Sequence, residues 1–227
     1  NVKITMISRI LGIVAPHYCY GCSQIGIVLC DNCKYNIINE PILMCTGCDR
    51  PMATAGLCGT CDASYDRVWV CGSYHSYLGD MIKAMKFDAV REVARTAAEL
   101  MSERLPSLPS NTIIIPIPTI RSHIRVRGFD HTALMARALS RRTGILYKPL
   151  IKRLNNTIQL GKSRKDRIAQ AKQAFYVNTV IDPEANYLIL DDVVTTGATV
   201  QAAAQCLQDA GARTVWVVTL THEPLDE

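Results

Sequence analysis

Residues 187–199 read Tyr-Leu-Ile-Leu-Asp-Asp-Val-Val-Thr-Thr-Gly-Ala-Thr, an apolar run that is followed by two adjacent carboxylates and a Thr/Gly loop. The apolar run predicts a buried strand, and the alanine- and glutamine-rich segment from Thr199 predicts a helix that ends at Gly211. The loop 195–199 therefore lies where free amide N–H groups and the positive helix terminus attract a phosphate. The alternative is a strand, an acidic turn and a threonine N-cap that bind nothing, which leaves the two carboxylates without a structural use.

Asp191 and Asp192 are predicted to lie at the carboxyl end of this strand. Carboxylates in that position accept hydrogen bonds from the hydroxyls of a ribose and favour a hard cation such as Mg²⁺. Together with the phosphate-attracting loop, they predict a site for a sugar phosphate.

Eight of the ten cysteines form four Cys-x-x-Cys knuckles. These are Cys19 with Cys22, Cys30 with Cys33, Cys45 with Cys48, and Cys58 with Cys61. Two thiolates at this spacing can point into one tetrahedron, so two knuckles complete a Cys₄ zinc site. The spacers favour two consecutive zinc ribbons, although the spacing also allows an interleaved arrangement that pairs the first knuckle with the third. A disulfide framework or an iron–sulfur cluster is less favoured, because no secretory signal is evident and such knuckles are more often zinc ribbons.

The metal is expected to supply the folding energy of this small module, since it has little core of its own. Its role is either structural or the binding of nucleic acid or a partner protein. The two remaining cysteines, Cys71 and Cys206, lie in apolar surroundings, which predicts buried thiols.

The positive charge of the chain is concentrated in one region. The formal net charge is +5, yet residues 121–172 contain fourteen lysines and arginines against only Asp130 and Asp166. Two tetrathiolate zinc sites would contribute about −2 each and lower the net charge to roughly +1. The distribution favours an anionic ligand or a nucleic-acid strand over a merely solvated face.

The composition is that of an ordinary globular protein. The chain has 227 residues, of which 48% are apolar and 20% are charged, so we expect one main domain and a small appendage. It has no apolar stretch of 18 or more residues, which argues against a membrane-spanning helix. Residues 4–14 place four apolar side chains on one helical face, which favours a short amphipathic helix packed on the protein over a secretory signal or a surface anchor.

Strands alternate with helices along the rest of the chain. Besides the run before Asp191, strands are expected at 68–72, 112–116 and 214–220, and helices at 78–87, 90–105, 132–143 and from 199. The polar and basic segment 153–171 separates two strand-like pieces and is typical of a mobile loop or a disordered hairpin tip. We therefore expect a mostly parallel α/β sheet that binds its ligand beyond the carboxyl ends of the strands. This domain would occupy residues 66–227 and follow an N-terminal helix and cysteine module in residues 1–65.

Two further segments favour an anionic ligand. Residues 116–119 follow a predicted strand and contain two prolines, which gives a rigid turn suited to receiving a pyrophosphate through its amides, although a plain strand-ending loop is the alternative. Arg127 is the arginine best placed for a phosphate, because its planar fork binds oxyanions bidentately. Asp130 is expected to cap the helix that follows it.

Taken in order, these segments resemble the ComF family of competence-associated proteins over nearly the whole chain. The resemblance rests on the paired knuckles, 82–87 (Ile-Lys-Ala-Met-Lys-Phe), 115–118 (Ile-Pro-Ile-Pro), 127–129 (Arg-Gly-Phe), 159–161 (Gln-Leu-Gly), Ala174-Phe175 and the Asp-Asp loop. The Asp-Asp loop is similar to the phosphoribosyl-diphosphate (PRPP) fingerprint of type I phosphoribosyltransferases. The family thus implies a type I phosphoribosyltransferase-like sheet with a small N-terminal zinc-ribbon domain.

The resemblance implies that PRPP or a related phosphate binds with Mg²⁺, and that Asp191 and Asp192 hold the ribose and are the catalytic pair of any transferase. The expected phosphate-binding residues are Asp191, Asp192, Val193, Val194, Thr195, Thr196, Gly197, Ala198, Thr199, Pro116, Ile117, Pro118, Thr119, Lys86, Arg127, Gln159, Lys162 and Arg164. Lys83 and Lys86 project in similar directions, and Lys86 is the one expected at the phosphates, while Arg153 and Arg167 are further candidates for closing on pyrophosphate.

The chain departs from the family pattern at three places. Thr119 and Ile120 stand where the family usually has a leucine and a histidine, so His123 is an unproven substitute for that histidine. Asp130 and His131 stand where Asn-Gln is common, and Asp130 cannot donate a hydrogen bond as asparagine does. Lys162 replaces a more usual leucine.

Three functions are compatible with these features. The family favours a cytoplasmic factor that binds PRPP and single-stranded DNA, beside a helicase, and assists DNA uptake in natural transformation. The second is an active phosphoribosyltransferase of nucleotide metabolism, although no residue pattern identifies an acceptor base. The third is a zinc-ribbon interaction protein with a vestigial phosphoribosyl site.

Overall fold

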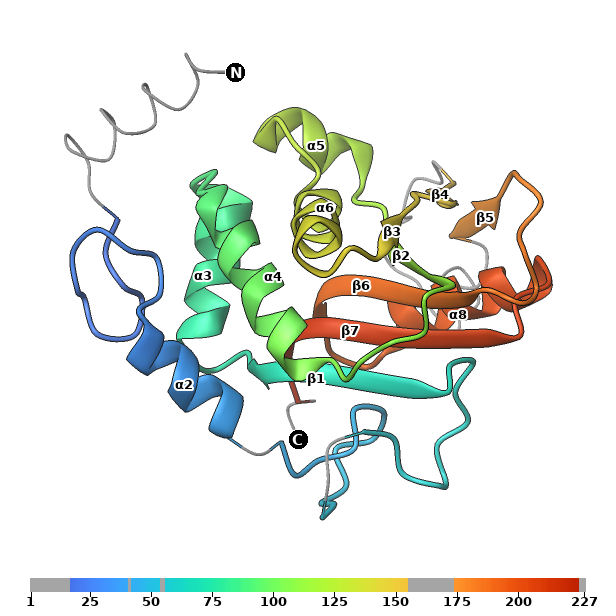
Figure 1. Cartoon of the computed structure of the whole chain (residues 1–227), viewed down its shortest axis with the longest axis horizontal. Coiled ribbons are helices and arrows are strands. Elements are labelled where there is room, and N and C mark those ends of the chain that lie inside the picture. Colours follow the sequence, from blue (N-terminus) through green and yellow to red (C-terminus); the bar gives the residue numbers. More distant parts are fainter. Residues whose placement is uncertain (1–16, 41, 54–55, 155–173, 225–227) are drawn as a thin grey trace, which may run out of the picture.

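The computed structural model describes residues 17–40, 42–53, 56–154 and 174–224. Its centre is a five-stranded parallel sheet in the order β1-β7-β6-β2-β3 (Figure 1). The strands are β1 (Arg67–Ser73), β2 (Thr112–Pro116), β3 (Leu146–Tyr147), β6 (Asn186–Val194) and β7 (Thr214–His222). The predicted mostly parallel α/β sheet is therefore confirmed.

Both faces of the sheet are covered, so β6 and β7 are buried along nearly their whole length. Leu188 and Leu190 belong to the core on one face, while Tyr187 and Ile189, which alternate with them, belong to the core on the other. The first face carries α3 (Tyr77–Phe87), α4 (Glu92–Arg104) and α6 (His131–Thr143), and the second carries α8 (Ala198–Asp209) (Figure 1).

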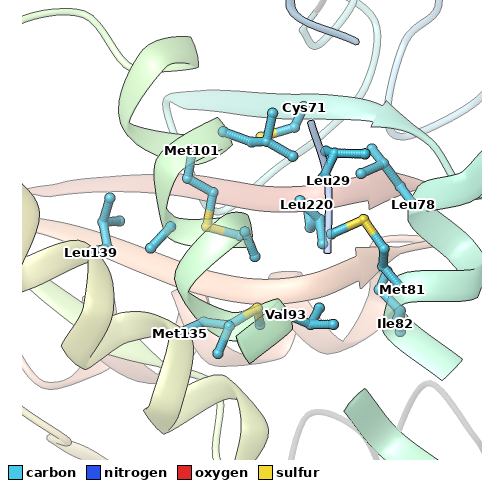
Figure 2. Packing of buried hydrophobic residues seen from close by; sticks show 14 of the residues in the cluster. Leu29, Cys71, Leu78, Met81, Ile82, Val93, Met101, Met135, Leu139 and Leu220 are labelled. Atoms are coloured by element: carbon cyan, nitrogen blue, oxygen red, sulfur yellow. The ribbon is translucent and has the colours of Figure 1, made fainter. Parts of the chain in front are cut away.

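The first part of the cysteine module shares the core of the sheet. Helix α2 (Asp31–Asn39) contributes Cys33 and Ile37 to the core on the first face, and Leu29 just before it is fully buried there. Figure 2 shows Leu29 among Cys71, Leu78 and Leu220. Polar contacts add to this packing: the Tyr77 hydroxyl donates to the Cys33 carbonyl at 2.8 Å. The sheet therefore depends on this segment for part of its core.

Several predicted elements are confirmed, and β2 matches its expected bounds. The two strand-like pieces around the basic segment are β4 (Ile151–Arg153) and β5 (Phe175–Val177), which pair antiparallel as a separate two-stranded sheet. Helix α5 (Arg121–Arg127) was not expected, because its seven residues show no apolar periodicity. The expected helix at 4–14 and most of the expected loop at 153–171 lie outside the described residues.

Of the two cysteines expected to be buried, only one is. Cys71 is fully buried in β1, whereas Cys206 on α8 is only partly buried, so the prediction for Cys206 is wrong. Cys206 lies at the margin of the second-face core, where its side chain packs against the cluster without being enclosed by it.

No helix within the described residues is both long and apolar enough to cross a membrane.

Candidate functional site

A cavity of about 430 Å³ opens beside the carboxyl ends of β2 and β6. It is lined by Lys86, Phe87, Ile117, Pro118, Thr119, Ile120, His123, Val126, Arg127, His131, Thr132, Arg153, Asp191, Asp192 and Thr199. The parallel register pairs Pro116 with Leu190, so the proline loop lies directly beside the two aspartates. Residues that are far apart in the sequence thus meet where ligands of parallel α/β sheets bind.

Asp192 lies at the centre of a charged network. Its side chain is 7% exposed and forms an ion pair with the Lys86 ammonium, and its Oδ1 lies 3.4 Å from the Nε2 of His131. The Nδ1 of the same imidazole lies 2.6 Å from the Arg127 guanidinium, which can only donate. Nδ1 is therefore the acceptor, and Nε2 carries the proton that faces Asp192. The cationic side chains of Lys86 and Arg127 are thus linked through the Asp192 carboxylate and the imidazole ring that follows it in the network.

The pKa values of the two aspartates move in opposite directions. Burial raises the pKa of Asp191 well above its usual range, and the neighbouring charge of Asp192 adds to this effect. For Asp192 burial acts in the same sense, but hydrogen bonding from His131 and the charge of Lys86 outweigh it and lower the pKa. When the pair holds a single proton, that proton is therefore favoured on Asp191, while Asp192 keeps its charge.

We expect Asp191→Asn to stabilise the free protein by an amount that grows as the pH rises. A carboxyl whose pKa is raised on folding contributes stability that is present below its unfolded pKa, about 3.9, and is lost as the pH rises through the folded value. Asparagine does not ionise and avoids that loss. Urea unfolding at mildly acidic and mildly alkaline pH, without added Mg²⁺, measures the difference.

The control for this prediction is Asp209→Asn, which changes an exposed carboxyl on α8. Its effect should be the same at both pH values. A stabilisation by Asp191→Asn that is independent of pH would contradict the expected burial of an ionising group.

The proline loop is held in place by Asp130. This carboxylate caps α6 by accepting from the Ala133 amide at 3.1 Å, as predicted, and it also accepts from the Thr119 hydroxyl at 2.9 Å. The Thr119 amide points to the same carboxylate at 3.4 Å, and the Ile117 amide donates to the Leu190 carbonyl at 2.9 Å. Proline has no amide N–H. The expectation that this loop offers free amides to a pyrophosphate is therefore not met, and the Thr119 amide, with the longest bond, is the easiest to release.

The loop after β6 keeps the features expected of a phosphate site. Gly197 has a φ of 70°, a left-handed conformation that glycine adopts without strain, and it takes the N-cap position of α8. Gly197 has no side chain to cap this helix, and of the first-turn amides only that of Ala198 has a side-chain acceptor among the described residues, the Thr196 hydroxyl at 3.3 Å. Thr195, Thr196 and Thr199 are exposed, and Thr199 lines the cavity.

The structure brings together some of the predicted site residues and not others. Those that line the cavity are Lys86, Ile117, Pro118, Thr119, Arg127, Arg153, Asp191, Asp192 and Thr199. Pro116 and residues 193–198 adjoin the cavity without lining it. Lys83 does not reach the cavity and pairs instead with exposed Asp80. Four further predicted residues lie outside the described ranges: Gln159, Lys162, Arg164 and Arg167. Arg153 lies with its guanidinium 4.9 Å from the Phe175 ring, and burial lowers its pKa.

His131 is the main functional candidate that was not predicted from the sequence. The sequence analysis noted it only as a departure from the family pattern. Its position in the first turn of α6, directly after the capping Asp130, is the signal that places its ring near the carboxyl end of the sheet. The exposed apolar rim of Phe87 and Val126 also escaped prediction.

The eight knuckle cysteines gather into two consecutive groups. Cys19, Cys22, Cys30 and Cys33 form one group, and Cys45, Cys48, Cys58 and Cys61 form the other, with the ligand atoms within 4.8 Å of one another in each group. This grouping matches the predicted consecutive ribbons and excludes the interleaved alternative. Backbone amides point to the sulfurs, as a metal thiolate site requires: the Cys30 amide lies 3.4 Å from the Cys19 Sγ, and the Cys58 amide 3.2 Å from the Cys45 Sγ.

Each group contains a thiol with a lowered pKa, whereas burial raises the pKa of Cys33 and hydrogen bonding to neighbouring thiols raises that of Cys61. Burial opposes ionisation of Cys19, but backbone hydrogen bonds outweigh it and lower the pKa to about 6. The hydroxyl and amide of Thr60 lower the pKa of Cys58 to about 5. Because the thiolate is the form that binds metal, both groups fit a tetrathiolate zinc site.

The second cysteine group contacts the end of the sheet and α8. The buried His222 at the end of β7 lies 3.0 Å from the Asp49 carboxylate, and the Ser64 amide donates to the Gln201 side chain at 2.9 Å. An added Cβ on Gly197 would lie 3.7 Å from the Tyr65 hydroxyl and 4.0 Å from the Thr46 carbonyl. The phosphate-type loop therefore rests against the segment that carries this cysteine group.

The fold and the site define the chain as an α/β protein with a five-stranded parallel sheet, a charged cavity at the carboxyl ends of its strands and two four-cysteine clusters near its N-terminus. Curated relatives narrow this class. The DNA utilization protein YhgH of Salmonella typhi is 30% identical over 224 residues, which cover 90% of this chain and 96% of that protein. Competence protein F of Haemophilus influenzae is 26% identical (83% and 94% covered), and competence protein ComFC of Bacillus subtilis is 25% identical (81% and 79% covered). The chain belongs to this ComF/ComFC/YhgH family.

Other comparisons add little to this assignment. No protein-family model matches the chain. Among solved structures, adenine phosphoribosyltransferase from Thermoanaerobacter pseudethanolicus is similar at a TM-score of 0.39 and 16% identity, covering 59% of this chain and 71% of that one. Glutamine PRPP amidotransferase from B. subtilis, in complex with ADP and GMP, gives the same TM-score and identity over 56% of this chain and 26% of that one. These scores are low, so the assignment rests on the sequence relatives and on the sheet itself.

Proposed function

We propose that this protein binds PRPP or a related sugar phosphate together with Mg²⁺ in the cavity, and that it also binds single-stranded DNA as an accessory factor for DNA uptake. The observation that carries the proposal is the meeting of Asp191, Asp192, Lys86 and Arg127 in one cavity at the carboxyl ends of parallel strands. The names of the relatives, which refer to competence and DNA utilization, support the link to DNA. The protein would act in the cytoplasm, beside a competence helicase.

The carboxylates of Asp191 and Asp192 fit Mg²⁺ by the chemistry of their oxygen donors. The cation would neutralise part of the charge of a pyrophosphate group when bound. Lys86 and Arg127 add fixed positive charge to the same cavity, while Asp192 accepts hydrogen bonds from the ribose hydroxyls. The two cysteine groups would each hold Zn²⁺ and stabilise an N-terminal module of residues 1–65, ahead of a phosphoribosyl-binding domain of residues 66–227.

Whether the bound phosphoribose is transferred is a separate question. An active phosphoribosyltransferase of nucleotide metabolism needs an acceptor, and among the lining residues no set of hydrogen-bonding side chains identifies a particular base. Binding is therefore the function that the geometry supports best. A zinc-ribbon interaction protein with a vestigial site would, by contrast, tolerate loss of both aspartates.

We expect PRPP with Mg²⁺ to raise the melting temperature of the protein, because a ligand that binds only the folded state stabilises it by about 2.7 kcal/mol at a hundred times its Kd. Calorimetric titration and thermal shift on one sample, with zinc measured by mass spectrometry, test the cavity and the cysteine groups together. Lys86→Met should weaken the response, and Lys83→Met, which removes an exposed lysine three residues earlier on the same helix, should not. Equal responses of the two variants, or no response of the wild type, would argue for a vestigial site.

A further inference from the structure

Helix α5 presents an unusual surface. None of its seven residues is buried, and Arg121, His123 and Arg125 are all exposed. Figure 1 shows α5 on the outer side of α6, away from the sheet. The helix contains no acidic residue, so all the charged side chains that it exposes are basic. A helix that buries none of its residues contributes little to the core. Its exposed basic side chains therefore favour a role in binding an anionic partner.

An exposed apolar rim lies beside this basic helix. Val126 on α5 is 92% exposed and Phe87 at the end of α3 is 77% exposed, and both line the mouth of the cavity. The Arg127 guanidinium donates to the Lys86 carbonyl at 2.7 Å and thereby joins the end of α5 to the end of α3. The basic face and the aromatic ring are thus held next to each other, whereas their positions in the sequence are about forty residues apart.

The charge around the mouth is complementary to a polyanion. Arg121 and Arg125 lie on α5, and Arg127, Lys86 and Arg153 line the cavity below them. Among the lining residues the acids are Asp191 and Asp192, which are buried. A strand of nucleic acid needs this combination, because cationic side chains bind its phosphates and an exposed aromatic ring stacks on an unpaired base.

We propose that α5 and Phe87 form a binding surface for single-stranded DNA at the mouth of the cavity. Arg121 and Arg125 bind consecutive phosphates, and Phe87 stacks on a base. Duplex DNA does not fit this surface, because its base faces are stacked inside the helix and inaccessible to Phe87. The proposal rests on the DNA-binding part of the proposed function and assigns it to a surface outside the cysteine groups.

The test is fluorescence anisotropy of a labelled oligothymidylate, titrated with the full chain at several salt concentrations. Arg121→Gln/Arg125→Gln should lower the affinity and reduce the slope of log K against log salt by about 1.4, which is about 0.7 for each phosphate that the variant no longer binds. The matched control, Arg95→Gln/Arg213→Gln, removes the same charge from exposed positions elsewhere and should leave the slope unchanged. Phe87→Ala should lower the affinity about tenfold. Its control, Tyr35→Ala, removes an exposed aromatic ring from α2 and should have no effect.

The outcomes separate this inference from the proposed function. If the wild type binds the oligonucleotide and the α5 variant binds as tightly as its charge control, DNA binds elsewhere on the protein. The inference is then wrong, while the proposed binding of single-stranded DNA still holds. If the wild type binds no single-stranded DNA, or prefers a duplex of equal length, both the inference and the DNA part of the function fail. The thermal response to PRPP and Mg²⁺ should be the same in the Arg121→Gln/Arg125→Gln variant and the wild type, which keeps the cavity as an independent measurement.

Discussion

Cys33→Ser is expected to lower the free energy of unfolding by about 4 kcal/mol or more, a size typical of the loss of a structural metal. Cys33 lies in the first cysteine group and also in the core that covers the first face of the sheet. Loss of a metal bound there would release α2, and with it the packing of Ile37 and the bond between the Tyr77 hydroxyl and the Cys33 carbonyl. The whole domain should therefore unfold more easily, not just the module.

The matched variant is Cys61→Ser in the second group, where Cys58 and Cys61 are partly exposed and Cys48 is exposed. We expect it to open its own segment locally and to change the main transition by less than about 1 kcal/mol. Cys206→Ser, a thiol outside both groups, controls for the chemistry of the substitution. Urea denaturation followed by circular dichroism, with bound zinc counted for each variant, measures all three. Equal costs for Cys33→Ser and Cys61→Ser would show that the first group is no more integrated than the second.

Asp192→Asn is expected to weaken Mg²⁺-dependent binding of PRPP about 10- to 100-fold, because a hydrogen bond to a charged group contributes about 1.5–3 kcal/mol. The variant keeps the shape of the side chain but loses the charge that holds a cation and accepts from ribose hydroxyls. Inorganic pyrophosphate has no ribose and relies on the cations of the cavity. Its affinity without Mg²⁺ should be unchanged or higher, since Lys86 is no longer paired with a carboxylate.

Titration calorimetry with PRPP and with pyrophosphate, each with and without Mg²⁺, separates these contributions. Asp209→Asn on the exposed face of α8 is the control and should bind both ligands as the wild type does. A parallel loss of affinity for both ligands would mean that Asp192 supports the fold of the cavity and does not contact the ribose.

The sequence predicted the elements whose signals are local. The bounds of β2, the cap of α6 by Asp130 and the Thr/Gly loop between β6 and α8 each depend on a few neighbouring residues, and each appears in the structure. The grouping of the cysteines was also accessible, because short spacers favour pairing of adjacent knuckles.

What the sequence could not predict depends on contacts between distant segments. The network from Arg127 through His131 to Asp192 joins two helices and a strand, and no spacing in the sequence reveals it. Helix α5 lacks the apolar periodicity that identifies longer helices, since it buries none of its residues. The sharing of one core by α2 and the sheet likewise follows from packing and not from any local pattern.

The ion pair between Lys86 and Asp192 means that the cavity supplies its own counterions before any ligand arrives. Binding of an anionic sugar phosphate is then an exchange, in which the ligand and its cation replace a pairing that already exists, so few ions are released to the solvent. Arg121 and Arg125 on α5 are exposed and have no carboxylate partner among the residues that line the cavity. Their counterions therefore come from the solution. The two sites therefore differ in their response to ionic strength. We therefore expect rising salt to weaken DNA binding at α5 well before it weakens the binding of a sugar phosphate in the cavity.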